Sequence, residues 1–226
     1  MIECQDVEFR YPGSPFSLCV PDLRIAEGES VALVGPSGSG KTTLLHLIAG
    51  LLLPEWGSVS TAGARFSDMS PAERQRFRIA TVGMVPQSFD LLDYLTVEEN
   101  ILLPYRVSRS LLLAEDAGER GRDLADRAGI GSLLGRRPER LSQGERQRVA
   151  ICRGLVTRPR VVLADEPTGN LDPGNQDRSV SLLLDEATAI GATVLTITHE
   201  VELRKRFGKV IDIRDLRGID RKGAAT

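Results

Sequence analysis

Eight consecutive residues in the first quarter of the chain have the types and spacing needed to bind a phosphate group. They are Gly35-Pro36-Ser37-Gly38-Ser39-Gly40-Lys41-Thr42, which fit the pattern G-x-x-x-x-G-K-[ST]. The glycines have no Cβ, so backbone N–H groups can curl around an anion. Lys41 adds a positive charge for the β- and γ-phosphates, and the Thr42 hydroxyl is placed to bind Mg²⁺. The loop predicts a nucleotide site with Mg²⁺; the alternative is a glycine-rich turn that contains a lysine by chance.

The segments on either side of this loop supply the local structure that the motif requires. Residues 30–34 (SVALV) form a short apolar run typical of a buried β-strand. Residues 42–49 have the pattern of a helix, and Gly50 sits where a C-terminal glycine cap belongs. Such a helix points the positive end of its dipole at the bound phosphate. Strand, loop and helix together favour phosphate binding.

A second group of chemically capable residues follows another buried strand. Residues 161–165 (VVLAD) are apolar up to Asp165, and Glu166 comes next. In an open parallel sheet, ligands bind beyond the carboxyl ends of the strands, so we expect this pair beside the phosphate loop. Asp165 can hold the Mg²⁺ shell through water, and Glu166 can polarise an attacking water as a general base. The alternative is a solvated acidic pair in a loop.

The bulk properties describe a globular chain and give no case for nucleic-acid binding. The 226 residues carry a net charge of −2, whereas a nucleic-acid surface would need a basic stripe. Three scattered cysteines without C-x-x-C spacing are typical of reduced thiols in a cytosolic protein. The longest apolar run, residues 44–53, is half of the roughly 20 residues of a membrane span, and the N-terminus lacks a secretory signal pattern. We expect a soluble, intracellular chain whose membrane part, if it has one, belongs to another polypeptide.

The strands and helices alternate along the chain, which predicts an α/β fold with a mainly parallel sheet. Besides the strands named above, we expect strands at 81–85 and 193–198 and an edge strand at 209–213. Near the N-terminus, residues 2–9 are β-prone, and a second strand over 16–20 is expected to stop at Pro21-Asp22.

Three capping boxes predict helix starts, at Ser70, Thr96 and Ser142. The first opens a helix to about Ile79, and the third opens a helix to about Val156. Between about 88 and 156 the pattern is mostly helical. We therefore expect a helical insertion between two parts of the sheet.

Two motifs carry a resemblance to a known family. Residues 164–172 (ADEPTGNLD) and the upstream residues 141–145 (LSQGE) closely resemble the ATP-binding cassette (ABC) ATPases, and the resemblance covers nearly the whole chain in the family's motif order. It implies a P-loop NTPase with a mainly parallel central sheet, an antiparallel β-subdomain in the N-terminal part and a helical insertion subdomain. Residues 1–226 would form one nucleotide-binding domain, with its core at 1–87 and 157–226 and its helical part at about 88–156.

The resemblance also implies a dimer that sandwiches two ATP molecules. Each ATP would lie between the phosphate loop of one subunit and the signature of a second copy or a paralogue, formed by Ser142, Gln143, Gly144 and Glu145. A helix N-terminus with a serine and a glycine can bind an anion without a basic residue. Alternatively, Ser142 and Glu145 cap a helix, and both roles are compatible. Gln143 stands where the family more often has a glycine, and Glu145 where it has glutamine.

Further residues match the family one position at a time. Tyr11 matches an aromatic residue that stacks on adenine; a tyrosine that merely ends a strand is the alternative. Gln87 matches the glutamine that senses Mg²⁺ and the attacking water. Asp172 matches the acid that crosses the dimer interface, and His199 matches the histidine that contacts the γ-phosphate. With Thr43 these complete the expected ATP site, in which Thr42, Gln87 and Asp165 serve Mg²⁺ and Lys41, Gln87, Glu166 and His199 serve catalysis.

The implied function is ATP hydrolysis that powers a separate transmembrane permease from the cytoplasmic face of the plasma (inner) membrane. The segment Gln87–Tyr105 is expected to dock a helix of that permease; core of the helical subdomain is the alternative for its apolar residues. The motifs are similar to the branch of lipoprotein-releasing, macrolide-exporting, antimicrobial-peptide and cell-division cassettes. A non-transport ABC ATPase, such as a cell-division regulator, is the alternative function. The long coiled coil of repair-type relatives and the paired cassettes of translation-type relatives have no counterpart in this sequence.

Overall fold

The computed structural model describes residues 1–108, 111, 116–169, 171–216 and 218, and it contains two β-sheets. The first is antiparallel, in the order β2-β1-β4-β5, with β1 at Ile2–Arg10, β2 at Ser17–Ile25, β4 at Trp56–Thr61 and β5 at Ala64–Arg65. The second is parallel, in the order β6-β7-β8-β3-β9, with β3 at Ser30–Val34, β6 at Val82–Val85, β7 at Val161–Asp165, β8 at Thr193–Ile197 and β9 at Lys209–Asp212. The expected parallel sheet, and β9 as its edge strand, are confirmed.

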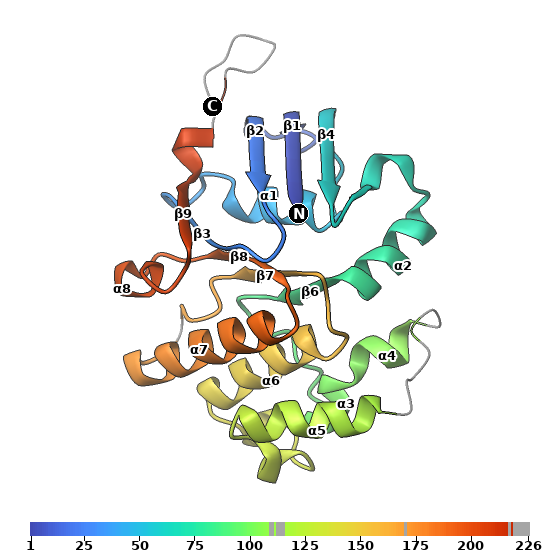
Figure 1. The fold of residues 1–226 in the computed structure, drawn as a ribbon, viewed down its shortest axis with the longest axis vertical. Helices are drawn as coiled ribbons and strands as arrows, with labels where there is room; N and C mark the ends of the chain where they lie inside the picture. Colours follow the sequence, from blue (N-terminus) through green and yellow to red (C-terminus); the bar gives the residue numbers. More distant parts are fainter. Residues whose placement is uncertain (109–110, 112–115, 170, 217, 219–226) are drawn as a thin grey trace.

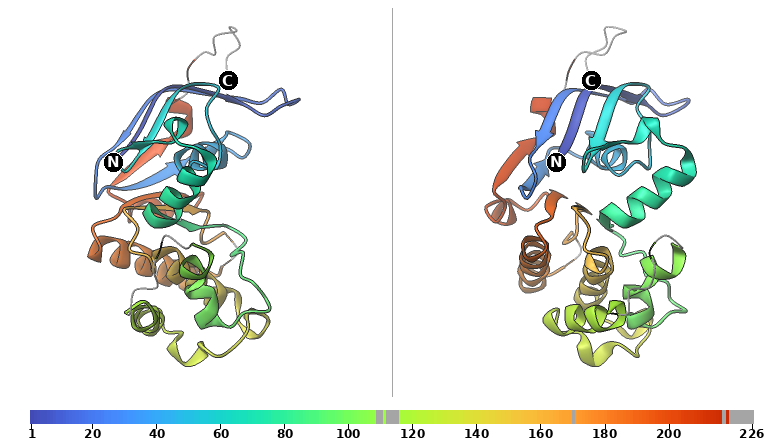
Figure 2. Two further views of the ribbon diagram at one scale, coloured as in Figure 1. Left: turned by 90° about the vertical axis from the view of Figure 1, so that its right-hand side faces the viewer. Right: turned by 45° about the vertical axis from the view of Figure 1, so that its right-hand side comes forward.

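The helices lie in two places relative to the parallel sheet (Figure 1). Helix α1, Lys41–Ile48, lies on the side of the antiparallel sheet, and α6 and α7, Gln143–Leu155 and Pro173–Ala189, cover the other face. Beyond them lie α3, α4 and α5, at Val97–Ile101, Leu103–Val107 and Ala117–Arg127. The turned views keep α5 and the antiparallel sheet at opposite ends of the molecule (Figure 2). The other α-helices among the described residues are α2 at Pro71–Thr81 and α8 at Val201–Arg204.

Apolar packing on the two faces of the parallel sheet follows this arrangement. One buried cluster joins both sheets through α1, and it includes Ile2, Leu33 and Leu45. The other joins the opposite face of the parallel sheet to α3, α5, α6 and α7, and it includes Ile101 and Val162. Alternate side chains of a strand point to opposite faces, so a strand such as β7 contributes to both clusters. The sheet that ends at the phosphate loop is therefore fixed from both sides.

The three predicted capping boxes are all present. In each, the serine or threonine side chain accepts from the backbone N–H three residues later, and the glutamate there accepts from the backbone N–H of the cap, at Ser70, Thr96 and Ser142. Among the described residues, no helix is both long enough and apolar enough to cross a membrane.

The expected end of the second strand at Pro21 is wrong, because β2 continues to Ile25. β2 is an edge strand, where a missing N–H does not interrupt a central ladder. The pairing with β1 skips one position, between Val7↔Val20 and Gln5↔Asp22, and Asp6 opposite has a φ of 48°. The sheet thus accommodates Pro21 through a local irregularity instead of ending there.

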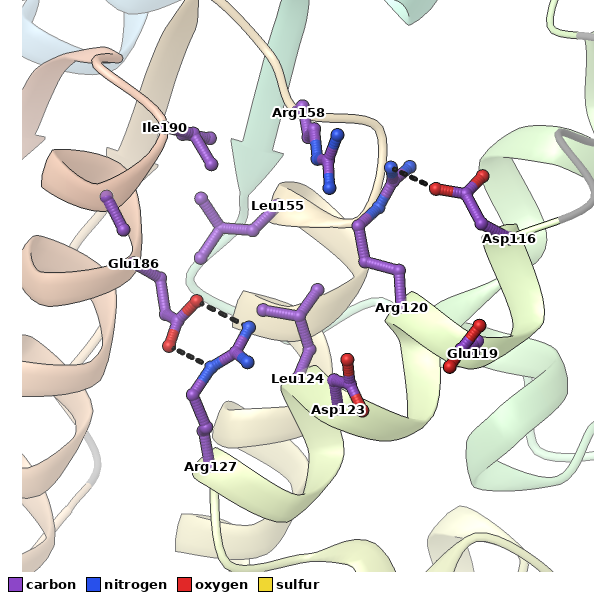
Figure 3. Close-up of a pocket in the computed structure, with 11 residues that line it drawn as sticks. Asp116, Glu119, Arg120, Asp123, Leu124, Arg127, Leu155, Arg158, Glu186 and Ile190 are labelled. Atoms are coloured by element: carbon purple, nitrogen blue, oxygen red, sulfur yellow. Dashed lines mark hydrogen bonds and ion pairs between the residues drawn. The ribbon is translucent and has the colours of Figure 1, made fainter.

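An ion pair joins the far helices to α7 (Figure 3). Arg127 on α5 donates from Nε to Oε1 of Glu186 on α7 at 2.6 Å and from Nη2 to Oε2 at 3.0 Å. Two turns earlier in α5, Nε of Arg120 donates to the carbonyl of Val156 at 2.6 Å, and Arg120 also lies 3.7 Å from the Asp116 carboxylate. The Arg127–Glu186 ion pair thus links α5 to α7. The extent of the helical subdomain, residues 88–156, stays a prediction.

Candidate active site

The phosphate loop connects the end of β3 to the start of α1 and turns through backbone conformations that favour glycine. Gly35 and Gly40 have φ values of 145° and 92°. A Cβ on Gly35 would lie 2.6 Å from the side chain of Ile213, and one on Gly40 would lie 3.0 Å from the ring of Phe16. Gly35 therefore needs glycine for space as well as for conformation, and Gly40 needs it for conformation, with a tight contact to Phe16 in addition. The loop residues 36–39 lie in bends and turns between these two glycines.

Lys41 is buried at the base of the loop. Its Nζ donates to the carbonyl oxygens of Gly35 at 3.0 Å and of Pro36 at 2.8 Å. Burial lowers the pKa of Lys41, while the carboxylates of Glu166, Asp165 and Asp212 act in the opposite direction. The three acids thus partly offset the effect of burial on the Lys41 ammonium group.

Thr42 and Asp165 bring the expected magnesium ligands together. The Thr42 hydroxyl hydrogen-bonds the Asp165 carboxylate, which stands at the carboxyl end of β7. Burial raises the pKa of Asp165, and the Thr42 hydrogen bond opposes that shift. A hydroxyl and a carboxylate are oxygen ligands of the kind that Mg²⁺ prefers. This donor set, beside a loop that binds phosphate, fits Mg²⁺ bound with a nucleotide.

Glu166 lies at the centre of a three-residue arrangement. Nε2 of His199 lies 2.5 Å from its Oε1, and Nε2 of Gln87 donates to its Oε2 at 3.2 Å. Gln87 follows β6, Glu166 follows β7 and His199 follows β8, so the carboxyl ends of three parallel strands supply the group. Glu166 has a φ of 43°, a strained conformation for a side chain of this kind. Its backbone N–H donates to the carbonyl of Ile197 at the end of β8, which holds that conformation.

Most of these residues line one cavity of about 440 Å³, and Gly35, Pro36 and Asp165 lie outside its lining. Its wall also includes Tyr11 from the end of the first strand region and Thr43 from α1; the Tyr11 hydroxyl lies 3.2 Å from Thr43 Oγ1. The Tyr11 ring packs edge-on against Phe9, with centroids 4.8 Å apart. The complete lining is Tyr11, Phe16, Ser37, Gly38, Ser39, Gly40, Lys41, Thr42, Thr43, Gln87, Glu166 and His199.

The signature residues are placed elsewhere. Ser142 caps α6, where its Oγ accepts from the N–H of Glu145 at 3.3 Å while the Glu145 carboxylate accepts from the N–H of Ser142 at 2.7 Å. Ser142 and Gln143 are exposed and Gly144 is buried. None of the four signature residues lines the phosphate-loop cavity. The capping role is therefore present within one chain, and it leaves the exposed start of α6 available to another molecule.

Asp172 caps the neighbouring helix α7 and also lies outside the cavity lining. Its Oδ1 accepts from the N–H of Asn175 at 3.2 Å, and the hydrogen bonds from Asn175 lower the pKa of Asp172. Asn170, which belongs to the motif 164–172, lies outside the described residues. The predicted site residues therefore fall into two groups: eleven of them line the cavity, whereas Gly35, Pro36, Asp165, Asp172 and the four signature residues lie outside its lining.

Two residues near the site were missed by the sequence analysis. Phe16 lines the cavity beside Tyr11, with the two rings 5.9 Å apart. Asn175 contacts both Asp172 and the start of α6. The first could have been noticed as a second aromatic residue across a turn from Tyr11. The second carries no signal, because its contacts join residues that are 27 and 31 positions apart along the chain.

Comparisons with known proteins agree with this geometry. A family model described as ABC transporter matches residues 20–169. The lipoprotein-releasing system ATP-binding protein LolD of Cereibacter sphaeroides is 43% identical over 201 residues, which are 88% of each chain. The protein of the same name from Pseudomonas fluorescens is 38% identical over 218 residues, 95% of each chain.

A solved structure of a dimeric ATP-binding cassette, in a post-hydrolysis state with ADP and Pi, is 31% identical, covers 94% of each chain and has a TM-score of 0.83. Motifs, fold and relatives thus agree along most of the chain, and the chain belongs to the ABC transporter family as an ATP-binding, ATP-hydrolysing subunit that works with Mg²⁺.

Proposed function

We propose that this ATPase subunit powers a lipoprotein-releasing complex from the cytoplasmic face of the inner membrane. The supporting observation is that relatives carrying the name lipoprotein-releasing system ATP-binding protein match 88% and 95% of the chain at about 40% identity. Because the match covers nearly the full length, it includes the surfaces that would contact a permease, and it therefore favours a permease of the same kind as a partner. The cargo would be a lipoprotein handled by that permease.

Within the site, the chain's own groups divide the work of ATP hydrolysis. The loop amides and Lys41 bind the β- and γ-phosphates and offset the charge that develops during transfer. Thr42, Asp165 and Gln87 would hold Mg²⁺, which would offset the negative charge of the phosphates. Glu166 orients the attacking water and accepts its proton, and His199 and Gln87 hold the Glu166 carboxylate in place. Tyr11 stacks on the adenine.

The complete site needs two copies of the chain. The phosphate-loop cavity lacks the signature residues, and the exposed Ser142 at the start of α6 offers a second anion-binding end. In the proposed dimer, the signature of each copy closes the cavity of the other, and Asp172 lies at the interface. ATP then adds contacts that need its γ-phosphate, and hydrolysis removes them. This cycle of closure and opening is what drives the permease.

A groove beside the segment Gln87–Tyr105 is the proposed docking site for a short helix of the permease. The segment itself is mixed: Val97 and Ile101 are fully buried in the core, whereas Tyr94 is 70% exposed. Next to it lies a cavity of about 220 Å³ between α2, β6, α4 and α6. Its lining is largely apolar with two arginines, and consists of Arg78, Ile79, Val82, Gly83, Met84, Leu103, Pro104, Val107, Arg153, Gly154 and Thr157. Such a groove suits the apolar face of a helix.

The test is to co-express the chain with a candidate lipoprotein-releasing permease and to purify the complex in detergent or lipid nanodiscs. We expect the two to co-purify, and a candidate lipoprotein to raise the ATPase rate several-fold. Val107→Asp should abolish co-purification, because Val107 is 60% exposed at the groove. Val210→Asp is the matched control, since Val210 is 48% exposed on β9 and lies outside the groove lining.

The two parts of the proposal can fail separately. A chain that hydrolyses ATP but neither binds nor responds to any permease would contradict the transport function. A complex that forms and responds to other cargo, but not to lipoproteins, would contradict lipoprotein release while leaving transport in place.

A further inference from the structure

Asn175 occupies a position between two elements that face away from the chain's own cavity. It is the third residue of α7, one turn after Asp172, which caps that helix. Its backbone N–H donates to Asp172 Oδ1 at 3.2 Å, as an ordinary cap requires. Its side chain adds a second, shorter bond, from Nδ2 to Asp172 Oδ2 at 2.6 Å. Both oxygens of the Asp172 carboxylate are therefore held by one residue.

The other end of the same amide reaches the signature helix α6. Nη1 of Arg148 donates to Asn175 Oδ1 at 3.2 Å. Arg148 lies one helical turn after Gly144, so the two residues present neighbouring positions on one face of α6. A Cβ added to Gly144 would lie 2.7 Å from Asn175 Oδ1 and 2.8 Å from its Cγ. The Asn175 amide thus packs directly against the backbone of Gly144.

This contact explains which signature position needs glycine. Gln143 is exposed and starts the helix, so a side chain is accommodated there. Gly144 is buried beneath Asn175, where any side chain would displace the amide. The departure from the usual two-glycine signature therefore falls at the position that the structure leaves open.

The carboxamide suits this place because it is both a donor and an acceptor. Its NH₂ group meets the Asp172 carboxylate and its oxygen meets the Arg148 guanidinium, and both bonds involve a charged partner. An aspartate could serve Arg148 but would repel Asp172. An alanine would serve neither.

We propose that Asn175 is a positioning residue that locks Asp172 to the start of the signature helix, so that both elements meet the opposing subunit as one rigid unit. This inference rests on the proposed function, which places Asp172 and the signature at the dimer interface. It adds that ATP-driven dimer closure depends on a residue that touches no nucleotide. Its effect should appear in dimerisation and in the turnover of the dimer, and not in nucleotide binding by the monomer.

The experiment measures ATP-dependent dimerisation by sedimentation in the Glu166→Gln background, which should bind ATP without hydrolysing it. Asn175→Asp keeps the size and the acceptor for Arg148 but loses the donor and adds a second carboxylate. We expect it, and Asn175→Ala, to weaken the dimer about tenfold or more, the scale of a lost charge-assisted hydrogen bond. Binding of a fluorescent ATP analogue to the dilute monomer should stay within twofold. Gln75→Glu, the same chemical change on the exposed face of α2, is the control and should leave dimerisation unchanged.

A rescue separates positioning from general stabilisation of α7. Adding Asp172→Asn to Asn175→Asp exchanges the donor and acceptor, so the hydrogen bond can form again while Arg148 keeps its partner. We expect this double variant to dimerise more tightly than Asn175→Asp alone, with a coupling that the two single changes do not predict by addition. The thermal midpoint of each variant, measured in parallel, shows whether the chain is folded at the assay temperature.

The outcomes distinguish the inference from the function on which it rests. If the Glu166→Gln parent does not dimerise with ATP, the result contradicts both the proposed function and the inference about Asn175. If the parent dimerises and both Asn175 variants dimerise equally well, the function stands and the inference is overturned. Weaker dimerisation with zero coupling between Asn175→Asp and Asp172→Asn also overturns it, because the effect would then not pass through Asp172.

Discussion

Glu166 and His199 face each other at the carboxyl ends of neighbouring strands, with Nε2 of His199 2.5 Å from Oε1 of Glu166. Across this contact, Nε2–H of His199 is the donor and the Glu166 carboxylate oxygen is the acceptor. Gln87 holds the second carboxylate oxygen at 3.2 Å. The general base is therefore oriented by two donors from two other strands, and each of the three residues can be tested by a different change.

Replacing Glu166 with glutamine should stop hydrolysis and preserve ATP binding. The change keeps the size of the side chain and removes the group that accepts a proton, which is typically worth about 10²-fold or more in rate. We expect kcat to fall by about that factor in a phosphate-release assay, with ATP affinity within about threefold of the parent. Glu200→Gln is the matched control, because Glu200 is exposed at the start of α8. Hydrolysis at the parental rate in Glu166→Gln would show that another group is the base.

Removing the imidazole should lower turnover more than it changes nucleotide binding. His199→Ala frees one oxygen of Glu166 and leaves its orientation to Gln87 alone. We expect kcat to fall about 10- to 100-fold with KM for ATP nearly unchanged, the pattern of an interaction that acts in the transition state. Gln87→Ala in the same assay should lose less, since its bond to Glu166 is longer. A large rise in KM at constant kcat in His199→Ala would instead assign His199 to ground-state binding.

Much of this site could be predicted because its residues belong to short local motifs. Strand, glycine loop and helix are contiguous at residues 30–49, and the acid pair follows its strand directly, so local pattern places both at one edge of the sheet. The three capping boxes could be predicted for the same reason, because Ser70, Thr96 and Ser142 each pair with a glutamate only three positions later in the sequence.

What could not be predicted depends on contacts between distant segments. The continuation of β2 through Pro21 depends on its place at a sheet edge, which only the assembled sheet defines. The resemblance placed Gln87 and Glu166 in one site, but it did not give the hydrogen bond between them, which joins residues 79 positions apart; the contact of Asn175 with Arg148 spans 27 positions. No periodicity or turn signal encodes such pairs, because they arise from packing of whole elements.

Tyr11 should contribute to ATP affinity through its ring and not through its hydroxyl. Tyr11 is 38% exposed and lines the cavity, and its ring makes an edge-on contact with Phe9, so part of the side chain is open for a base to stack on. Stacking of a base on an aromatic ring is worth about 1–3 kcal/mol. We expect Tyr11→Ala to weaken ATP binding about tenfold or more in a calorimetric titration. Tyr11→Phe loses only the hydrogen bond to Thr43 and should bind within about threefold of the parent; equal losses in both variants would contradict a stacking role.

Cys4 and Cys152 should resist thiol reagents in the folded chain. Burial raises the pKa of each thiol to about 12. The thiolate is the reactive form, and raising the thiol pKa from its ordinary value of 9.0 to about 12 lowers the thiolate fraction at neutral pH by about a thousandfold. We expect labelling by a disulfide reagent to be slow, to rise about tenfold per pH unit up to pH 10, and to become rapid in guanidinium chloride. The variant Cys19→Ser isolates these two thiols, and rapid labelling of the native variant would contradict the burial.

The Arg127–Glu186 pair should tie α5 to α7 with a measurable coupling energy. The pair is bidentate, and the Glu186 side chain is only 12% exposed while that of Arg127 is 52% exposed, so solvent screens the interaction in part. Exposed ion pairs are worth about 0–1 kcal/mol, and we expect a coupling of about 1 kcal/mol from a double-mutant cycle of Arg127→Ala and Glu186→Ala in chemical unfolding. The same cycle on Arg24–Asp22, whose side chains are 67% and 62% exposed, should give a value near zero. The Arg127 side chain extends from α5 to Glu186 on α7 (Figure 3), so Arg127→Ala should also speed amide hydrogen exchange in α5 relative to α7. Unchanged exchange in α5 together with zero coupling would show that apolar packing alone holds these helices to the sheet.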